Sequence, residues 1–185
     1  MKKLIATIAL TTAAWAASET QVVMETSMGD LTITLHEEAA PITVENFLKY
    51  VDDGFYEGIV VHRIEPNFVI QAGGYDANLN YITPTYPGIQ NESDNGLANE
   101  RGTLSMARTS DPNSANSQFF INLVNNSNLN GSASRPGYAV FATVVEGMDV
   151  VDAIASVETR RARELGGMPT PVEPVIIKSV RRLAE

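Results

Sequence analysis

Three residues able to recognise a neutral ligand lie close together in the sequence: Arg63, Phe68 and Gln71. Arginine offers a permanent cation with five N–H donors, glutamine offers an amide, and phenylalanine offers an apolar ring. Side chains alternate between the two faces of a strand, so spacings of five and three residues would normally separate them. A turn at residues 65–67 interrupts that alternation and allows all three to share one face. Such a patch suits a neutral, partly apolar ligand better than a phosphate or a metal.

The elements that must position these residues are short strands. Alternating apolar residues and turn signals predict strands at 21–27, 31–36, 101–108, 118–123, 138–145 and 174–182, and on both sides of the turn at 65–67. Helical periodicity occurs twice, from Pro41 to about Gly54 and from about Met148 to Ser156. The irregular segment 75–99 is long enough to be functional or a surface excursion. Arg160, Arg161 and Arg163 are expected in a charged, solvated loop.

About eight strands with two helices predict a mainly all-β fold, because an α/β fold would need more helices. We expect a closed eight-stranded antiparallel barrel capped by two α-helices. Side chains fill the interior of a barrel of that size. A small ligand would therefore bind on the outer face, against the long loops.

Other kinds of active site find little support in the sequence. It lacks a Gly-x-Ser-x-Gly elbow, a Walker loop, a His-Glu-x-x-His motif and a dinucleotide fingerprint, and it has no cysteine and two histidines. His62, beside Arg63, would point to the opposite face and is predicted to be a packed core residue. His36 is predicted to be a surface residue at a strand end. We expect no metal site and no cofactor.

The N-terminus has the pattern of a signal peptide. Met1-Lys2-Lys3 precedes an apolar run from Leu4 to Ala14, which is too short to span a bilayer, and Ala14-Trp15-Ala16 offers a small-x-small cleavage site. We expect residues 1–16 to be a signal peptide and residues 17–185 to be one domain of an exported, periplasmic protein. The alternative is an uncleaved amphipathic N-terminus.

The composition limits the partners of the chain. The formal net charge is −9, which argues against nucleic acid or an anionic membrane as the main partner. After the predicted leader, no segment is long and apolar enough to cross a membrane. We expect a monomer.

Three motifs, in order, closely resemble those of the cyclophilins, which are peptidyl-prolyl cis-trans isomerases built on an eight-stranded barrel with two helices. They are Val61-His62-Arg63-Ile64-x-Pro66-x-Phe68-x-Ile70-Gln71-x-Gly73-Gly74, Gly102-Thr103-Leu104-Ser105-Met106-Ala107 and Ser117-Gln118-Phe119-Phe120-Ile121. The resemblance runs from about Val22 to Val180 and is greatest to the exported bacterial branch. It implies that the substrates are proline-containing polypeptides and that the protein assists the folding of exported proteins.

The resemblance also implies a role for particular residues. Arg63 would be the catalytic arginine. Phe68, Phe120 and Leu129 would form a pocket for the proline ring, with Val69 beside it. Gln71 and Gln118 would be polar wall residues, and Ala107 and Arg108 would hold the peptide backbone. Tyr138 would also bind substrate.

Four positions depart from the common family pattern. Val69 stands where methionine is usual, Arg108 where asparagine is usual, and Tyr138 where histidine is usual. Asn128 replaces a tryptophan or phenylalanine, and loss of that ring should weaken binding of the inhibitor cyclosporin more than catalysis. A second hypothesis is therefore a proline-recognising chaperone or binding module with little turnover. Intact Arg63 favours the isomerase, whereas Asn128 favours the binding module.

Overall fold

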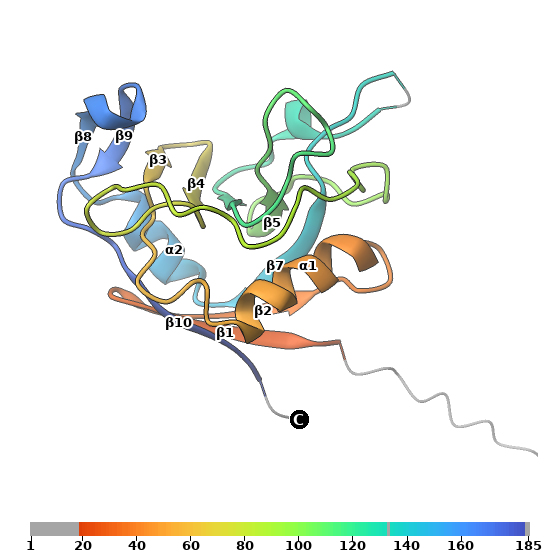
Figure 1. The fold of residues 1–185 in the computed structure, drawn as a ribbon, viewed down its shortest axis with the longest axis horizontal. Coiled ribbons are helices and arrows are strands. Elements are labelled where there is room, and N and C mark those ends of the chain that lie inside the picture. The colour runs from red at the N-terminus through yellow and green to blue at the C-terminus, as the bar shows by residue number, and fades with distance from the viewer. Residues whose placement is uncertain (1–18, 133, 184–185) are drawn as a thin grey trace, which may run out of the picture.

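The fold is one curled antiparallel sheet with a helix on each side (Figure 1). The computed structural model describes residues 19–132 and 134–183, so the predicted signal peptide, residues 1–16, lies outside the described residues. Eight strands form the sheet in the order β10-β1-β2-β7-β5-β6-β4-β3. Their bounds are Gln21–Thr26 for β1, Gly29–Leu35 for β2, Arg63–Glu65 for β3, Val69–Ala72 for β4, Thr103–Met106 for β5, Phe119–Asn122 for β6, Val140–Glu146 for β7 and Ile177–Arg182 for β10.

The prediction of a closed barrel is wrong, because the edge strands β3 and β10 do not pair with each other. Strand β3 is three residues long, and the ladder at this edge is reduced to an isolated bridge between Val60 and Ile176. The seam is bridged ahead of β3 and at the start of β10, where the Val61 amide donates to the Val175 carbonyl (2.9 Å) and the Ile177 amide donates to the Ile59 carbonyl (2.8 Å). The sheet is therefore an open, curled half-barrel.

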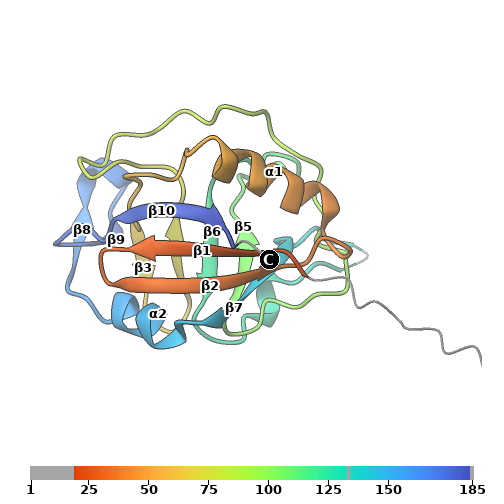
Figure 2. The same cartoon turned by 90° about the horizontal axis from the view of Figure 1, so that it is seen from below.

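The two predicted helices are present and lie on opposite sides of the curled sheet (Figure 2). They are α1 (Pro41–Asp52) and α2 (Met148–Ala155). Phe47 of α1 is fully buried and its ring packs against those of Phe119 and Phe141, with centroids 5.9 Å and 5.1 Å away. These contacts attach α1 to strands β6 and β7.

The arginine-rich segment after α2 was predicted to be a loop, and that prediction is wrong. It forms a hairpin of β8 (Thr159–Ala162) and β9 (Met168–Pro171), joined through a 3₁₀ turn, η2 (Arg163–Leu165). The buried Thr170 hydroxyl donates to the His62 carbonyl at 2.8 Å, which ties the hairpin to the residue before β3. Because Arg160 and Arg161 are charged and exposed, β8 lacks the apolar residues from which a strand is predicted.

The long segment 75–99 stabilises the start of α1 through a residue that is distant in sequence. Helix α1 begins after Ala40, which offers no side-chain cap. The Glu92 carboxylate instead accepts hydrogen bonds from the Ile42 amide (3.1 Å), the Thr43 amide (2.8 Å) and the Thr43 hydroxyl (2.6 Å). An anion at a helix N-terminus satisfies free N–H groups and interacts favourably with the helix dipole.

Glu92→Ala should lower the free energy of unfolding by about 1–2 kcal/mol, because three donors at the start of α1 lose their acceptor. Urea unfolding followed by circular dichroism measures the change. Glu57→Ala, at an exposed glutamate, is the matched control and should change stability by less than about 0.5 kcal/mol. Equal effects of the two substitutions would show that Glu92 does not cap α1.

Candidate active site

The candidate site lies on the outer face of strands β3, β4, β6 and β5, where four side chains form a row across the sheet. Arg63 is the cross-strand partner of Gln71, Gln71 of Phe120, and Phe120 of Ser105. The neighbouring positions on these strands, Ile64, Ile70, Ile121 and Leu104, belong to the hydrophobic core. Alternation along each strand therefore directs the row away from the core. The prediction that Arg63 and Gln71 share a face is confirmed.

A tight turn places Phe68 and Val69 next to this row. Asn67 has a φ of 59°, a left-handed conformation that asparagine tolerates better than most residues. The Phe68 amide donates to the Glu65 carbonyl at 3.0 Å and closes the turn. Val69 is paired with Glu65 and Asn122 and is 2% exposed. The register therefore puts Glu65 and Val69 on the same face as Arg63 and Gln71, whereas Phe68 precedes β4 and is partly exposed.

Arg63 is held by a chain of polar side chains. Its Nη1 donates to Gln71 Oε1 at 3.3 Å, and Gln71 Nε2 donates to Gln118 Oε1 at 3.1 Å. On the other side, Arg63 Nη2 lies 3.4 Å from Glu65 Oε1, and the arginine side chain is 27% exposed. Glu65 was not among the predicted site residues. The guanidinium is thus oriented from two sides while part of it stays accessible.

Gln118 approaches β4 closely because Gly73 and Gly74 have no side chains. A Cβ atom at Gly73 would lie 2.4 Å from the Ser117 carbonyl oxygen, and one at Gly74 would lie 2.6 Å from the Gln118 amide. The Gln118 carbonyl accepts from the Ala107 amide at 2.9 Å, which places Ala107 beside it. The glycine pair therefore allows the polar wall to assemble.

Three side chains stack at the other end of the row. The Phe120 ring meets the Tyr138 ring edge to face at 5.5 Å between centroids, and the Arg108 guanidinium lies 4.6 Å from the centre of the Tyr138 ring. Phe120 is buried and the other two are partly exposed. Arg108, Phe120 and Tyr138, predicted from separate motifs, are brought together here.

Leu129 ends a short 3₁₀ turn, η1 (Ser127–Leu129). Its carbonyl accepts from the Tyr138 amide at 2.9 Å, so Leu129 and Tyr138 are adjacent. Asn128, on the same turn, is exposed, and its carbonyl accepts from Arg135 Nη2 at 2.9 Å. Leu129 and Asn128 thus follow one another on a turn joined to Tyr138, and Asn128 offers no ring there.

A buried asparagine network lies behind the site, and the sequence analysis missed it. Asn126 Nδ2 donates to the Phe68 carbonyl (3.0 Å) and to Asn122 Oδ1 (2.8 Å). Asn99 Oδ1 accepts from Ser105 Oγ (2.7 Å) and Asn122 Nδ2 (3.2 Å). Buried asparagines that satisfy one another hold their backbones in one arrangement. The signal was weak: Asn122 is the last residue of β6, Asn126 follows it in an asparagine-rich segment, and Asn99 ends the irregular segment 75–99.

His62 is a packed core residue, as predicted. It is 1% exposed, its ring lies 4.7 Å from that of Tyr75, and its Nδ1 has no hydrogen-bond partner among the described residues. Burial, followed by the neighbouring Arg63 charge, lowers the pKa of His62 from 6.5 to about 4. The imidazole is therefore neutral at pH 7.

The buried His62 should make the protein less stable in mild acid. The unfolded chain takes up the proton near pH 6.5 and the folded chain near pH 4, so stability is complete above pH 6.5 and declines as the pH falls toward 4. The loss from this group is about 3 kcal/mol. Urea unfolding between pH 4 and 7 measures the slope, which should become shallower in His62→Gln. An unchanged slope in that variant would assign the acid sensitivity to other groups.

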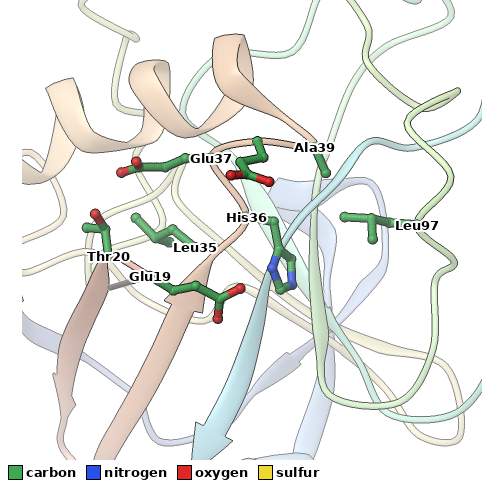
Figure 3. A pocket seen from close by; sticks show the side chains of 8 residues that line it. Glu19, Thr20, Leu35, His36, Glu37, Ala39 and Leu97 are labelled. Atoms are coloured by element: carbon green, nitrogen blue, oxygen red, sulfur yellow. The ribbon is translucent and has the colours of Figure 1, made fainter. Parts of the chain in front are cut away.

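A separate pocket of about 440 Å³ lies between the end of β2 and Leu97 (Figure 3). His36, Glu19 and Glu37 line it, and His36 Nε2 is 2.8 Å from the Thr143 hydroxyl. None of its lining residues belongs to the candidate site. Within the described part of the chain, no group of three acidic or histidine side chains could hold a metal ion. No described helix is long and apolar enough to cross a membrane.

The chain is similar in sequence to known peptidyl-prolyl cis-trans isomerases. A family model described as cyclophilin type peptidyl-prolyl cis-trans isomerase/CLD matches residues 21–182. The chain is 49% identical over 170 residues to a peptidyl-prolyl cis-trans isomerase of Acinetobacter baylyi, covering 91% of this chain and 88% of the relative. It is 48% identical over 164 residues to peptidyl-prolyl cis-trans isomerase B of Escherichia coli, covering 86% and 97%.

Solved structures share the fold. A cyclophilin type peptidyl-prolyl cis-trans isomerase of Cryptosporidium parvum matches with a TM-score of 0.75 at 24% identity, covering 91% of this chain and 99% of that one. A second crystal structure of that protein, in the presence of the dipeptide Ala-Pro, matches with a TM-score of 0.74 at 25% identity, covering 89% and 99%.

Proposed function

The chain belongs to the cyclophilin-type peptidyl-prolyl cis-trans isomerases, and from that premise we propose that Arg63 catalyses rotation of X-Pro bonds held on the outer face of the sheet. The observation that carries the proposal is the row in which the guanidinium of Arg63, the amide of Gln71 and the ring of Phe120 lie side by side. Phe68, Val69, Phe120 and Leu129 would form the apolar part of the site, and Gln71, Gln118 and Tyr138 its polar part. Ala107 and Arg108 would hold the peptide backbone.

The chemistry of the X-Pro bond explains the use of an arginine. Rotation has a barrier of about 18–20 kcal/mol because the amide loses its resonance as it twists. In the twisted transition state the proline nitrogen regains a localised lone pair, to which a guanidinium can donate a hydrogen bond. That bond is absent in both planar ground states, so it stabilises the transition state selectively. Lowering the barrier by about 7 kcal/mol gives about a 10⁵-fold acceleration.

The polar partners of Arg63 prepare it for this role. The contacts with Gln71 and Glu65 restrict the guanidinium before substrate binds, so little further ordering is needed in the transition state. Arginine remains charged at every physiological pH and presents a rigid donor fork. The reaction needs no proton transfer, nucleophile, metal or cofactor.

The apolar residues of the site have a different role, which is to bind the substrate. Phe68, Phe120 and Leu129 would hold the proline ring, while the residue before proline remains free to rotate. Covering the bond excludes water and strengthens the interaction with Arg63. The presence of Ala-Pro with a solved relative of the same fold supports a proline-containing ligand.

The proposed setting is the folding of exported proteins. The signal-peptide pattern of residues 1–16 supports export to the periplasm, with residues 17–185 as the mature, monomeric domain. X-Pro isomerisation takes tens to hundreds of seconds and limits the folding of many chains, so a periplasmic isomerase has substrates there.

A second candidate is a proline-recognising chaperone with little turnover, and the exposed Asn128 favours it by leaving one side of the site without a ring. Refolding of a protein limited by proline isomerisation separates the two functions. The isomerase should accelerate the slow phase when present at one part in fifty. A chaperone should suppress aggregation only at stoichiometric amounts and leave the slow rate unchanged, and that result would refute the proposal.

A further inference from the structure

Arg108 places a positive charge next to the proline site, and we propose that it selects substrates carrying an acidic residue close to the proline. This inference rests on the function proposed for Arg63 and Phe120, and it adds a preference in sequence to that activity. The ligand class is an X-Pro peptide with aspartate or glutamate beside the bond.

The position of Arg108 follows from two aromatic contacts. The Tyr138 ring meets the Phe120 ring at 5.5 Å, and the Arg108 guanidinium lies 4.6 Å from the Tyr138 ring centre. An extended peptide advances about 3.4 Å per residue. The guanidinium is therefore within about three residues of a proline seated on Phe120, which is close enough to meet a neighbouring side chain.

The guanidinium is held in one orientation by backbone carbonyls. Nε donates to the Gly137 carbonyl (3.1 Å), Nη1 to the Thr109 carbonyl (2.9 Å) and Nη2 to the Pro136 carbonyl (2.9 Å). These bonds use three of the five N–H groups of an arginine and leave the others for a ligand. A charge already fixed in place loses less side-chain entropy when it binds a carboxylate.

No carboxylate of the described chain neutralises this charge. Arg63 pairs with Glu65, but Arg108 forms no ion pair within residues 19–132 and 134–183. The acidic residue nearest in sequence, Asp111, uses Oδ1 to accept from the Asn113 amide at 2.9 Å. Arg108 is thus a local cation in a chain of net charge −9. Because the overall field repels anions, a preference for acidic peptides would require a close contact of this kind.

The test compares Ala-Glu-Pro-Phe with Ala-Gln-Pro-Phe, and Ala-Pro-Glu with Ala-Pro-Gln, in NMR exchange experiments that need no coupling protease. The acidic member of at least one pair should have a kcat/KM about 3-fold higher in the unmodified protein, the size typical of a solvent-accessible ion pair. The ratio of kcat/KM for the glutamate peptide to kcat/KM for its glutamine counterpart should approach one in Arg108→Gln, and also in 0.5 M NaCl. It should be retained in Arg108→Lys, which keeps the charge.

Arg135→Gln is the matched control, because Arg135 is an exposed cation that bonds to the Asn128 carbonyl. That variant should keep the ratio of the unmodified protein. A ratio of one or less in the unmodified protein, the same ratio in Arg108→Gln, or an equal loss in Arg135→Gln would overturn the inference. The function itself is judged separately, by whether turnover of the glutamine peptides depends on Arg63.

Discussion

Arg63→Ala is expected to lower kcat/KM for an Ala-Pro peptide by about 10³-fold while leaving the fold intact. Removal of one preorganised donor to a developing charge typically costs about 10²–10³-fold. The upper end is expected here because Arg63 is the cation of the Arg63–Gln71–Phe120 row, whereas the Arg108 guanidinium is held by backbone carbonyls beyond the Phe120 end of it. Magnetisation exchange between cis and trans peptide signals measures the rate, and circular dichroism checks the fold.

Two further variants separate geometry from charge. Arg63→Lys keeps the cation but loses the planar fork, and it should recover no more than about tenfold of the lost activity. Glu65→Gln removes the carboxylate 3.4 Å from Arg63 and keeps the guanidinium, so its kcat/KM should stay within about twofold. Exchange rates in Arg63→Ala equal to those of the unmodified protein would overturn the mechanism.

Asn128→Trp should raise the affinity for cyclosporin by about 30-fold. The family usually carries an aromatic ring at this position, whereas the asparagine side chain is exposed on the turn that carries Leu129. A tryptophan packed against a bound ligand typically contributes about 2 kcal/mol, which is about 30-fold in Kd. The same substitution should change turnover of a short Ala-Pro peptide much less, because the proline is held by Phe68, Phe120 and Leu129.

Isothermal titration calorimetry measures the affinity of the unmodified protein and of both variants. Tryptophan fluorescence would not serve for the comparison, because the only tryptophan of the sequence, Trp15, lies in the predicted signal peptide. Ser127→Trp, one residue earlier and also exposed, is the matched control and should leave the inhibitor affinity unchanged. Nanomolar binding by the unmodified protein would show that Asn128 does not weaken the site.

The sequence predicted the parts of the fold that depend on local pattern. Both helices and the strands around the 65–67 turn follow from periodicity and turn residues, and the structure confirms them. The β8–β9 hairpin was missed because Arg160 and Arg161 face solvent and Pro169 and Pro171 suggest a turn. The open seam was missed because closure depends on the length of β3, and element boundaries are poorly determined by propensity.

The candidate site, like the fold, could be predicted only in part from the sequence. Arg63 and Gln71 could be placed together because a turn separates them, whereas Arg108 and Tyr138 were joined to the site only by family resemblance. The contact of Arg63 with Glu65 and the network of Asn99, Asn122 and Asn126 depend on side-chain packing between distant segments. A single sequence carries no direct signal for such contacts, and buried asparagines resemble those of exposed loops.

The pairing of β1 with β10 has a consequence for how the chain acquires its structure. Val22 is the ladder partner of Arg182, so the first strand has no outer neighbour until almost the whole polypeptide has emerged. Native pairings of such long sequence separation form late and slowly. The sheet is therefore completed only after synthesis of its last strand, and until then β1 has β2 as its one ladder partner.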